Sequence, residues 1–328
     1  MNSQYPLNPL DFGKVSTYSI SERKSKVNAA MFGKAMDGSE NLLGFVSKLP
    51  HILAGESLRN LVRAILYAKT SHRAIIWALG GHVLKVGLGP VINDLIQAGF
   101  VSGIAMNGSA AIHDFEIALC GSTSEDVEEQ IGGGRFGMAR ETAEYMNAAI
   151  AQAAANGVGL GEGLGQFIAQ AESGKIDFHY RSVSILAEAY SRNIPVTVHV
   201  AVGTDIIHTH PQTSGKNLGE TSYRDFRLFC SMARELDGGG VYLNIGSAVV
   251  LPEVFLKAVS VVRNLGHQLE EFTTANLDFI QHYRPTQNVL KRPTQNSGQA
   301  IALTCHHEIM IPLLAAALKS SAGGQSHE

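Results

Sequence analysis

The chain has few cysteines. Its 328 residues include only Cys120, Cys230 and Cys305, and no two of them form a C-x-x-C pair. This spacing argues against a disulfide framework and against a cysteine-based zinc site. We therefore expect reduced thiols that are mostly buried, as free cysteines usually are.

An excess of charge and a long hydrophobic run are also missing. Lys and Arg total 26 and Asp and Glu total 29, so the formal net charge is −3, and no basic stripe is present that could neutralise phosphates. No apolar run reaches ~18 residues, and the first residues, MNSQYPLNPLDFGK, lack the charged-then-apolar pattern of an export signal. These absences predict a cytoplasmic protein that binds neither nucleic acid nor a membrane.

Material for a core is abundant, because 45% of the residues are hydrophobic. Residues 1–38 are polar with scattered aromatic side chains, and they predict an extended N-terminal arm. Such an arm either wraps a neighbouring subunit or stays loose. Residues 39–328 predict a single domain.

Apolar periodicity predicts that strands and helices alternate over most of this domain. Helices are expected first at 39–46 and 57–68, the second with Ser57 as its N-cap. Four strands, at 74–79, 101–106, 195–202 and 241–245, then alternate with helices at 90–99, 138–155, 182–192, 222–236 and 252–265. This order predicts an α/β fold with a Rossmann-like parallel sheet and helices on both faces.

The most informative stretch runs from 101 to 127. An apolar strand leads into the small residues 106–111, followed by His113 and Asp114. Ligands of open α/β sheets bind at the carboxyl ends of strands, and a turn without bulky side chains lets a cofactor approach the backbone. We expect chemistry at this turn.

Two glycine clusters lie between the halves of the chain. The first, at 132–137, contains Arg135, which we expect to contact an anion. The second, at 157–165, resembles a G-x-G-x-x-G string, but it follows an expected helix, whereas the dinucleotide fingerprint follows a strand. It is therefore interpreted as a flexible lid or an inter-helix turn.

A histidine-rich segment follows the strand at 195–202. Asp205, His208 and His210 lie beyond its carboxyl end, and a His-x-His pair with a carboxylate could bind Zn²⁺ or another divalent metal. The spacing of residues in the sequence does not identify a third metal ligand. Contact with a polar substrate or cofactor, and a hydrogen-bonded structural role, stay open as alternatives.

Several of these segments resemble archaeal deoxyhypusine synthases. Residues 107–109, followed by His113-Asp114, are similar to that family's Thr-Gly-Ala…His-Asp turn. Residues 80–87, followed by the expected helix 90–99, are similar to the family's Thr-Ser-Asn…Ser-Gly opening and helix. Three later segments resemble family motifs in the same order. Ser214-Gly215-Lys216-Asn217-Leu218-Gly219-Glu220 is similar to Asp-Gly-Ser-Leu-Gly-Asp, residues 241–250 are similar to a strand ending in Gly-Gly-Gly-Val-Val, and residues 273–276 are similar to Asn-Thr-Ala-Gln. The resemblance covers roughly residues 75–293.

The resemblance implies NAD as cofactor, a small polar or amine-bearing substrate, and a homotetramer whose active sites form between subunits. It places the cofactor on small residues at strand ends or turns. These are Gly80, Gly81, Gly87, Asn107, Gly108, Ser109, Gly246, Ser247, Ala248, Thr274 and Ala275.

One departure from the family changes the expected chemistry. Deoxyhypusine synthases carry a nucleophilic lysine in a Trp-Gly-Lys segment, but this chain has no lysine between Lys291 and Lys319. An imine needs an amine nucleophile, which His and Glu cannot replace. Cys305-His306-His307-Glu308 stands there instead, and it either lines the cleft or caps the helix expected at 309–318. Of the family's substrate carboxylates, only Glu220 remains.

Three hypotheses follow. The first is a divergent deoxyhypusine synthase-like, NAD-dependent enzyme without lysine-imine chemistry, with His113, Asp114, Glu220, His306 and His307 as catalytic candidates. The second is a metal-assisted hydrolase or lyase that uses His208 and His210 with His306 or His307. The third is a non-catalytic ligand-binding protein on the same scaffold.

Overall fold

The computed structural model describes residues 4–172, 174 and 176–324, and this part of the chain forms a six-stranded sheet with all its strands parallel. The strand order is β3-β2-β1-β4-β5-β6, the order of a doubly wound Rossmann fold. The expected fold class is confirmed. The strands are β1 (Ile75–Leu79), β2 (Gly103–Asn107), β3 (Val196–His199), β4 (Val241–Ile245), β5 (Thr273–Asp278) and β6 (Gln299–Thr304).

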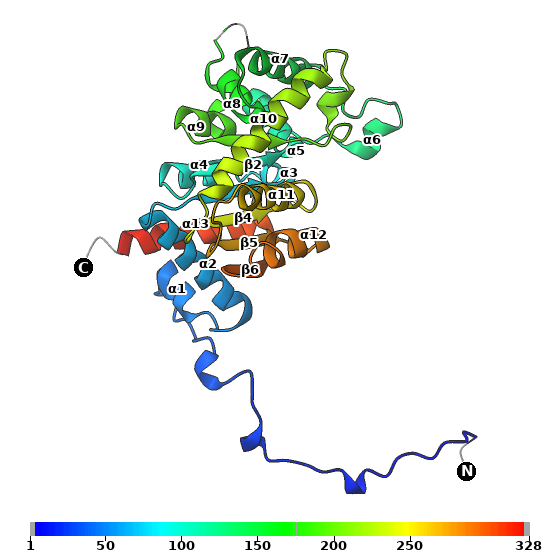
Figure 1. Ribbon diagram of the computed structural model, residues 1–328, viewed down its shortest axis with the longest axis vertical. Coiled ribbons are helices and arrows are strands. Elements are labelled where there is room, and N and C mark those ends of the chain that lie inside the picture. The colour runs from blue at the N-terminus through cyan, green and yellow to red at the C-terminus, as the bar shows by residue number, and fades with distance from the viewer. Residues whose placement is uncertain (1–3, 173, 175, 325–328) are drawn as a thin grey trace.

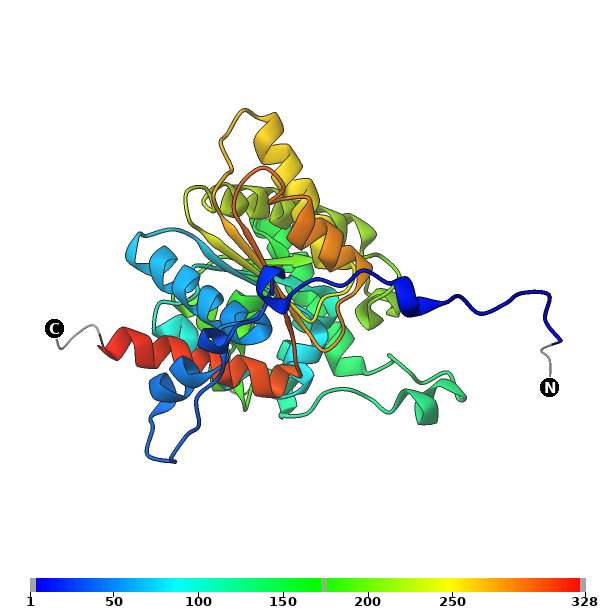
Figure 2. The same ribbon diagram turned by 90° about the horizontal axis from the view of Figure 1, so that it is seen from below.

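Helices cover both faces of the sheet because alternate side chains of each strand point to opposite sides. In β1, Trp77 belongs to one buried apolar cluster, together with side chains of α2, α5 and α13, whereas Ile76 belongs to a second cluster, together with side chains of α10 and α11. Figure 2 shows α11 (yellow) and α13 (red) on opposite sides of the strands. The helices that build these layers are α2 (Leu53–Thr70), α4 (Gly89–Gln97), α5 (Gly108–Cys120), α7 (Arg140–Asn156), α8 (Leu160–Ala169), α9 (Ile185–Ser191), α10 (Gly215–Arg234), α11 (Val250–Asn264) and α13 (His307–Gly324).

Short elements complete the described chain. α1 (Leu42–Lys48) lies beside α13. The chain before it has three 3₁₀ turns, and residues 4–30 extend away from the body (Figure 1), whereas the backbones of Met31 and Lys34 hydrogen-bond to those of His51 and Lys48. The segment that carries α6 (Val127–Ile131) projects from the same body, as Figure 2 also shows. The remaining short helices are α3 (Gly81–Lys85), α12 (Tyr283–Pro285), two 3₁₀ turns at Arg181–Val183 and Ile206–Thr209, and a π-helical turn at Thr286–Lys291.

The second glycine cluster corrects one expectation. The inter-helix turn covers only residues 157–159, between the end of α7 and the start of α8, and Gly161, Gly163 and Gly165 lie within α8. A Cβ on Gly161 would lie 2.1 Å from the carbonyl oxygen of Val196, and one on Gly163 would lie 2.4 Å from Cβ of Ala153. The glycines therefore let α8 pack directly against β3 and α7.

Other boundaries also differ from expectation. Ser57 lies inside α2, which begins at Leu53, so Ser57 is not an N-cap. α10 begins at Gly215 rather than at 222, because the Ser214 side chain accepts a hydrogen bond from the Asn217 N–H at 3.3 Å. The three cysteines are free, but only Cys230 is buried and Cys120 is exposed, so the expectation of mostly buried thiols is wrong. No helix within the described residues has the length and apolar character that a membrane crossing needs.

Candidate functional site

The carboxyl edge of the sheet has a switch point between β1 and β4. From β1 the chain winds outward to β2 and β3, then returns across the sheet to β4 on the other side of β1. Doubly wound proteins bind ligands in the crevice at such a point. The candidate site is therefore built from the segments that follow β1, β2 and β4.

Glycines bring these segments into contact. The N–H of Gly80 donates to the carbonyl oxygen of Ile245 at 2.8 Å, and a Cβ on Gly80 would lie 2.0 Å from the carbonyl oxygen of Gly246. A Cβ on Gly81 would lie 2.3 Å from Oγ of Ser109, and one on Gly108 would lie 2.1 Å from Oδ2 of Asp205. Protein atoms thus fill the space beside each of these glycines, which gives the glycines a packing role whatever else they do.

His113 lies on α5, one and a half turns from its N-terminus, and its ring is held beside the end of β1. The ring carbon Cδ2 would lie 3.2 Å from a Cβ on Gly81. Burial, assisted by the positive charge of Lys85, lowers the pKa of His113 to about 4. The imidazole is therefore neutral near pH 7.

A cavity of about 210 Å³ opens beside this ring. It combines one cation, three carboxylates, the three hydroxyl groups of Ser109, Ser124 and Thr204, and apolar walls around His113. Its lining includes Lys85, Ser109, Ile112, His113, Glu116, Glu125, Phe136, Thr204 and Asp205. This polar pocket lies beside the switch point, between the segments that follow β1, β2 and β3.

Glu116 and Thr123 extend the site in a way that the sequence analysis missed. Nδ1 of His113 lies 2.6 Å from Oγ1 of Thr123, whose hydroxyl donates to Glu116. Thr142 on α7 donates to the other carboxylate oxygen of Glu116 at 2.9 Å. The only sequence signal is the i,i+3 spacing of His113 and Glu116, which places them on one face of a helix.

Asp114 points away from this cavity. Its side chain is buried and accepts hydrogen bonds from the Ser184 hydroxyl (2.6 Å), the Ile185 N–H (2.7 Å) and the Leu186 N–H (3.1 Å). These donors form the start of α9, so Asp114 ties α5 to α9. Burial raises its pKa to about 6 although the three hydrogen bonds act in the opposite direction.

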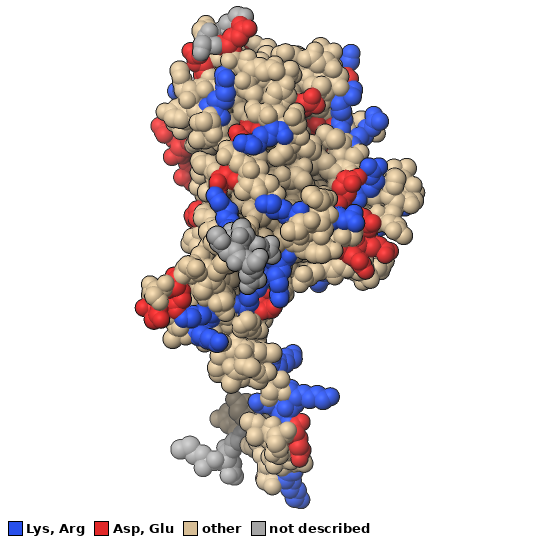
Figure 3. Space-filling model, turned by 90° about the vertical axis from the view of Figure 1, so that its left-hand side faces the viewer, with Lys and Arg blue, Asp and Glu red and all other residues tan. Residues whose placement is uncertain are grey.

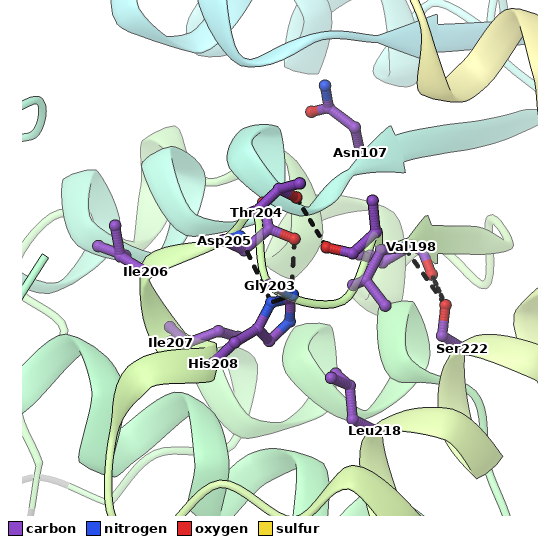
Figure 4. Close-up of polar contacts among 12 residues, drawn as sticks. Asn107, Val198, Gly203, Thr204, Asp205, Ile206, Ile207, His208, Leu218 and Ser222 are labelled. Atoms are coloured by element: carbon purple, nitrogen blue, oxygen red, sulfur yellow. Dashed lines mark hydrogen bonds and ion pairs between the residues drawn. The ribbon is translucent and has the colours of Figure 1, made fainter.

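The loop after β3 carries the residues proposed as metal ligands (Figure 4). Nδ1 of His208 accepts from the backbone N–H groups of Gly203 (3.1 Å) and Asp205 (3.4 Å), and its Nε2 lies 3.9 Å from Oδ2 of Asp205. Burial lowers the pKa of His208 and raises that of Asp205 to about 6. Within residues 4–172, 174 and 176–324, no three His, Cys, Asp or Glu side chains are grouped as a metal site, and His210 adds no ligand to this pair.

His306 and His307 lie at the same edge of the sheet but have different surroundings. His307 is buried, with Nε2 3.3 Å from the carbonyl oxygen of Leu277 and 3.8 Å from Oδ1 of Asp278. Burial lowers its pKa, and its Nδ1 has no hydrogen-bond partner among the described residues. His306 is exposed and stacks on Phe279 at 6.0 Å between ring centroids, and His82 lies edge-on to Phe279 at 5.6 Å.

His307 connects this aromatic group to the switch point. A Cβ on Gly246 would lie 2.9 Å from Cε1 of His307. Because α13 begins at His307, the segment both starts the last helix and borders the crevice. The cleft and helix-cap interpretations of residues 305–308 are therefore compatible in space.

The other predicted site residues, the catalytic candidate Glu220 among them, have varied surroundings. Asn107 is the N-cap of α5, with its side chain accepting from the Ala110 N–H at 2.9 Å, and Gly87 takes a φ of +79° after α3. Ser247 is buried and accepts from the Leu251 N–H at 3.3 Å, beside the partly exposed Ala248. Glu220 is exposed on α10.

Thr274 and Ala275 require a correction. They were expected at a strand end or turn, but residues 273–276 lie inside β5, and both side chains are buried. On the same strand, Asn276 accepts from Asn244 at 2.7 Å and donates to Gln281 at 2.8 Å. These buried amides crosslink β4 and β5 near their carboxyl ends.

Comparison with known proteins supports the fold. No protein-family model matches the chain, and no curated protein matches it. Among solved structures, the fold is similar to that of AgrE in a ternary complex with ornithine and NAD⁺, with a TM-score of 0.54 and 13% identity over 88% of this chain and 34% of AgrE. Unliganded AgrE gives a TM-score of 0.52 at 12% identity over 88% of this chain and 34% of that one.

A candidate deoxyhypusine synthase from Entamoeba histolytica is similar too, with a TM-score of 0.52 and 11% identity over 88% of this chain and 96% of that one. The expected likeness to deoxyhypusine synthases is thus confirmed for the fold, while membership of the family stays a prediction. The chain spans about a third of the length of AgrE.

Proposed function

We propose that this protein is an NAD-dependent enzyme that acts on a small polar or amine-bearing substrate, with His113 as the proton acceptor. One observation carries the proposal: a neutral, half-buried imidazole borders a polar cavity next to the switch point of a doubly wound sheet. The crystallised complex of AgrE with ornithine and NAD⁺ supports the same ligand classes.

The side chains at this edge fit a nicotinamide nucleotide chemically. Lys85 and Ser109 offer a cation and a hydroxyl group beside the cavity, which suit phosphate and ribose oxygens. The exposed faces of His82, Phe279 and His306 offer a stacking surface for a heteroaromatic ring. The unpartnered Nδ1 of His307 offers one buried polar contact.

When bound, the nicotinamide accepts or supplies a hydride. The chain's own residues orient the substrate and move its proton. His113 accepts that proton, and its low pKa keeps it free to do so near neutrality. Asp205, Glu116 and Glu125 give the cavity a negative character that attracts an ammonium group.

The absence of a lysine in the family's catalytic segment supports chemistry without an imine to the protein. Residues 292–318 contain no lysine, and the lysine within the cavity lining is Lys85 on α3, after the first strand. Its position beside His113 suits a charge contact. The alternative of a metal-assisted hydrolase gains no support from the dispersed His208 and His210.

We further propose a homotetramer in which the arm, residues 1–38, contacts a neighbouring copy while residues 39–328 form one domain. Large apolar side chains of the arm are exposed, among them Leu10 at 84% and Phe12 at 74%. Figure 3 shows the arm projecting from the body, with mixed charges over the rest of that face. Burial of such side chains against a second copy would remove this apolar surface from water.

Calorimetric titration of the full chain with NAD⁺ tests the proposed function. Binding is expected for the wild type and is expected to weaken at least tenfold in Lys85→Ala. Lys257→Ala is the matched control, because Lys257 pairs with Glu253 on the outer surface of α11 at 2.9 Å. No heat of binding for any nicotinamide nucleotide at millimolar concentration would reject the proposal.

A further inference from the structure

The hydrogen bonds around His113 define which of its two ring nitrogens carries the proton. Glu116 receives a hydroxyl hydrogen at each carboxylate oxygen, from Thr123 at Oε2 and from Thr142 at Oε1. An ionised carboxylate only accepts hydrogen bonds, so this arrangement suits the charged form of Glu116.

The hydroxyl group of Thr123 has one hydrogen, and Glu116 takes it. The oxygen of Thr123 can then only accept from Nδ1 of His113, which lies 2.6 Å away. Nδ1 must therefore carry a hydrogen. Since His113 is neutral, Nε2 has a free lone pair.

We infer that Glu116 and Thr123 are positioning residues that fix the Nδ1–H tautomer of His113 and aim Nε2 as its proton-accepting atom. The inference rests on the proposed function for the use of Nε2, although the tautomer itself depends only on the hydrogen-bond chain. The orientation agrees with it, because Cδ2, the carbon bonded to Nε2, is the ring atom that faces Gly81 at the end of β1.

The assignment also gives Glu116 a role distinct from that of the other carboxylates of the cavity. Glu125 accepts from the backbone N–H of Gly137 at 3.1 Å and makes no contact with His113. Oδ2 of Asp205 has no hydrogen-bond partner among the described residues. Among the described carboxylates of the cavity lining, Glu116 is the one that a hydroxyl group links to the imidazole, and the hydrogen bond at one ring nitrogen sets which nitrogen carries the proton.

The test is a long-range ¹H–¹⁵N spectrum of the full chain near neutral pH, with the His113 signals assigned by their loss in His113→Gln. The wild type is expected to carry its imidazole proton on Nδ1. Thr123→Val removes the hydroxyl and should shift the population to the Nε2–H tautomer, whereas Thr123→Ser should restore the wild-type pattern. Ser122→Ala, in the same segment, is the matched control and should leave the spectrum unchanged.

Glu116→Gln gives an independent check. Its amide can donate to Thr123, which frees the Thr123 hydrogen for Nδ1 and should favour the Nε2–H tautomer. A wild-type proton on Nε2, or a wild-type spectrum in Thr123→Val, would overturn the inference. These outcomes are separable from failure of the proposed function, because absent NAD⁺ binding with the proton on Nδ1 rejects only the latter.

Discussion

Replacement of Asp114 by alanine should destabilise the fold rather than remove a reacting group. The variant leaves the Ser184 hydroxyl and the N–H groups of Ile185 and Leu186 without their acceptor in a buried place. At ~1 kcal/mol for each lost hydrogen bond, the free energy of unfolding should fall by about 3 kcal/mol. Denaturant unfolding followed by circular dichroism measures the difference.

The effect should depend on pH in a defined direction. Burial raises the pKa of Asp114 from its ordinary value near 3.8 to about 6 in the fold, so the folded protein holds the proton more tightly than the unfolded chain. The stabilisation by Asp114 is then fully present below about pH 4 and is lost as the pH rises through 6. The difference in the free energy of unfolding between the wild type and Asp114→Ala should therefore be larger at pH 4 than at pH 7.

Asp94→Ala is the control, because Asp94 is an exposed partner of Lys319 and should contribute under ~1 kcal/mol. Equal stability of wild type and Asp114→Ala at pH 4 would refute the assignment of Asp114 to the start of α9. Unchanged stability together with lost turnover would return Asp114 to the group of catalytic residues.

Three further outcomes are expected. Lys85→Ala should raise the pKa of His113 in an NMR titration, because it removes a positive charge and leaves Glu116, Glu125 and Asp205 around the ring; an unchanged or lower pKa would contradict this. Incubation with NAD⁺ and spermidine followed by borohydride should leave every lysine unmodified, and a mass increase on any lysine would show that imine chemistry persists. Light scattering should report a tetramer that weakens when residues 1–38 are removed, and a monomer at micromolar concentration would reject the assembly.

The strands β1, β2 and β4 could be predicted from the sequence because they are short apolar runs bounded by glycine or polar residues. β5 reads Thr-Thr-Ala-Asn-Leu-Asp and lacks that signal. Its buried Asn276 accepts a hydrogen bond from Asn244, which is distant in the chain, and single-sequence periodicity cannot show this. Tertiary contacts, rather than the local sequence pattern, therefore determine that residues 273–278 form a strand.

α8 was misinterpreted for a related reason. Glycine costs about 1 kcal/mol in a helix, so five glycines in nine residues predict a break. The contacts of Gly161 with β3 and of Gly163 with α7 exist only in the packed fold, where any side chain would clash. Close packing therefore outweighed the local preference.

The candidate site was predictable only in part. The position of His113 beyond β2 followed from the rule that ligands bind at carboxyl strand ends. The different directions of His113 and Asp114 follow from the 3.6-residue helical turn, but only once α5 is known to begin at Gly108. Thr123 and Thr142 could not be identified, because their link to Glu116 depends on how two later segments pack on α5.

The most direct test of the account is the NMR signal of His113 during titration with NAD⁺. We predict that the ring resonances of His113 shift in a saturable manner, whereas those of His267, an exposed residue that follows α11 at the opposite edge of the sheet, stay unchanged. Saturable binding without a change at His113 would place the nucleotide elsewhere, and no response to millimolar NAD⁺ would contradict the central claim.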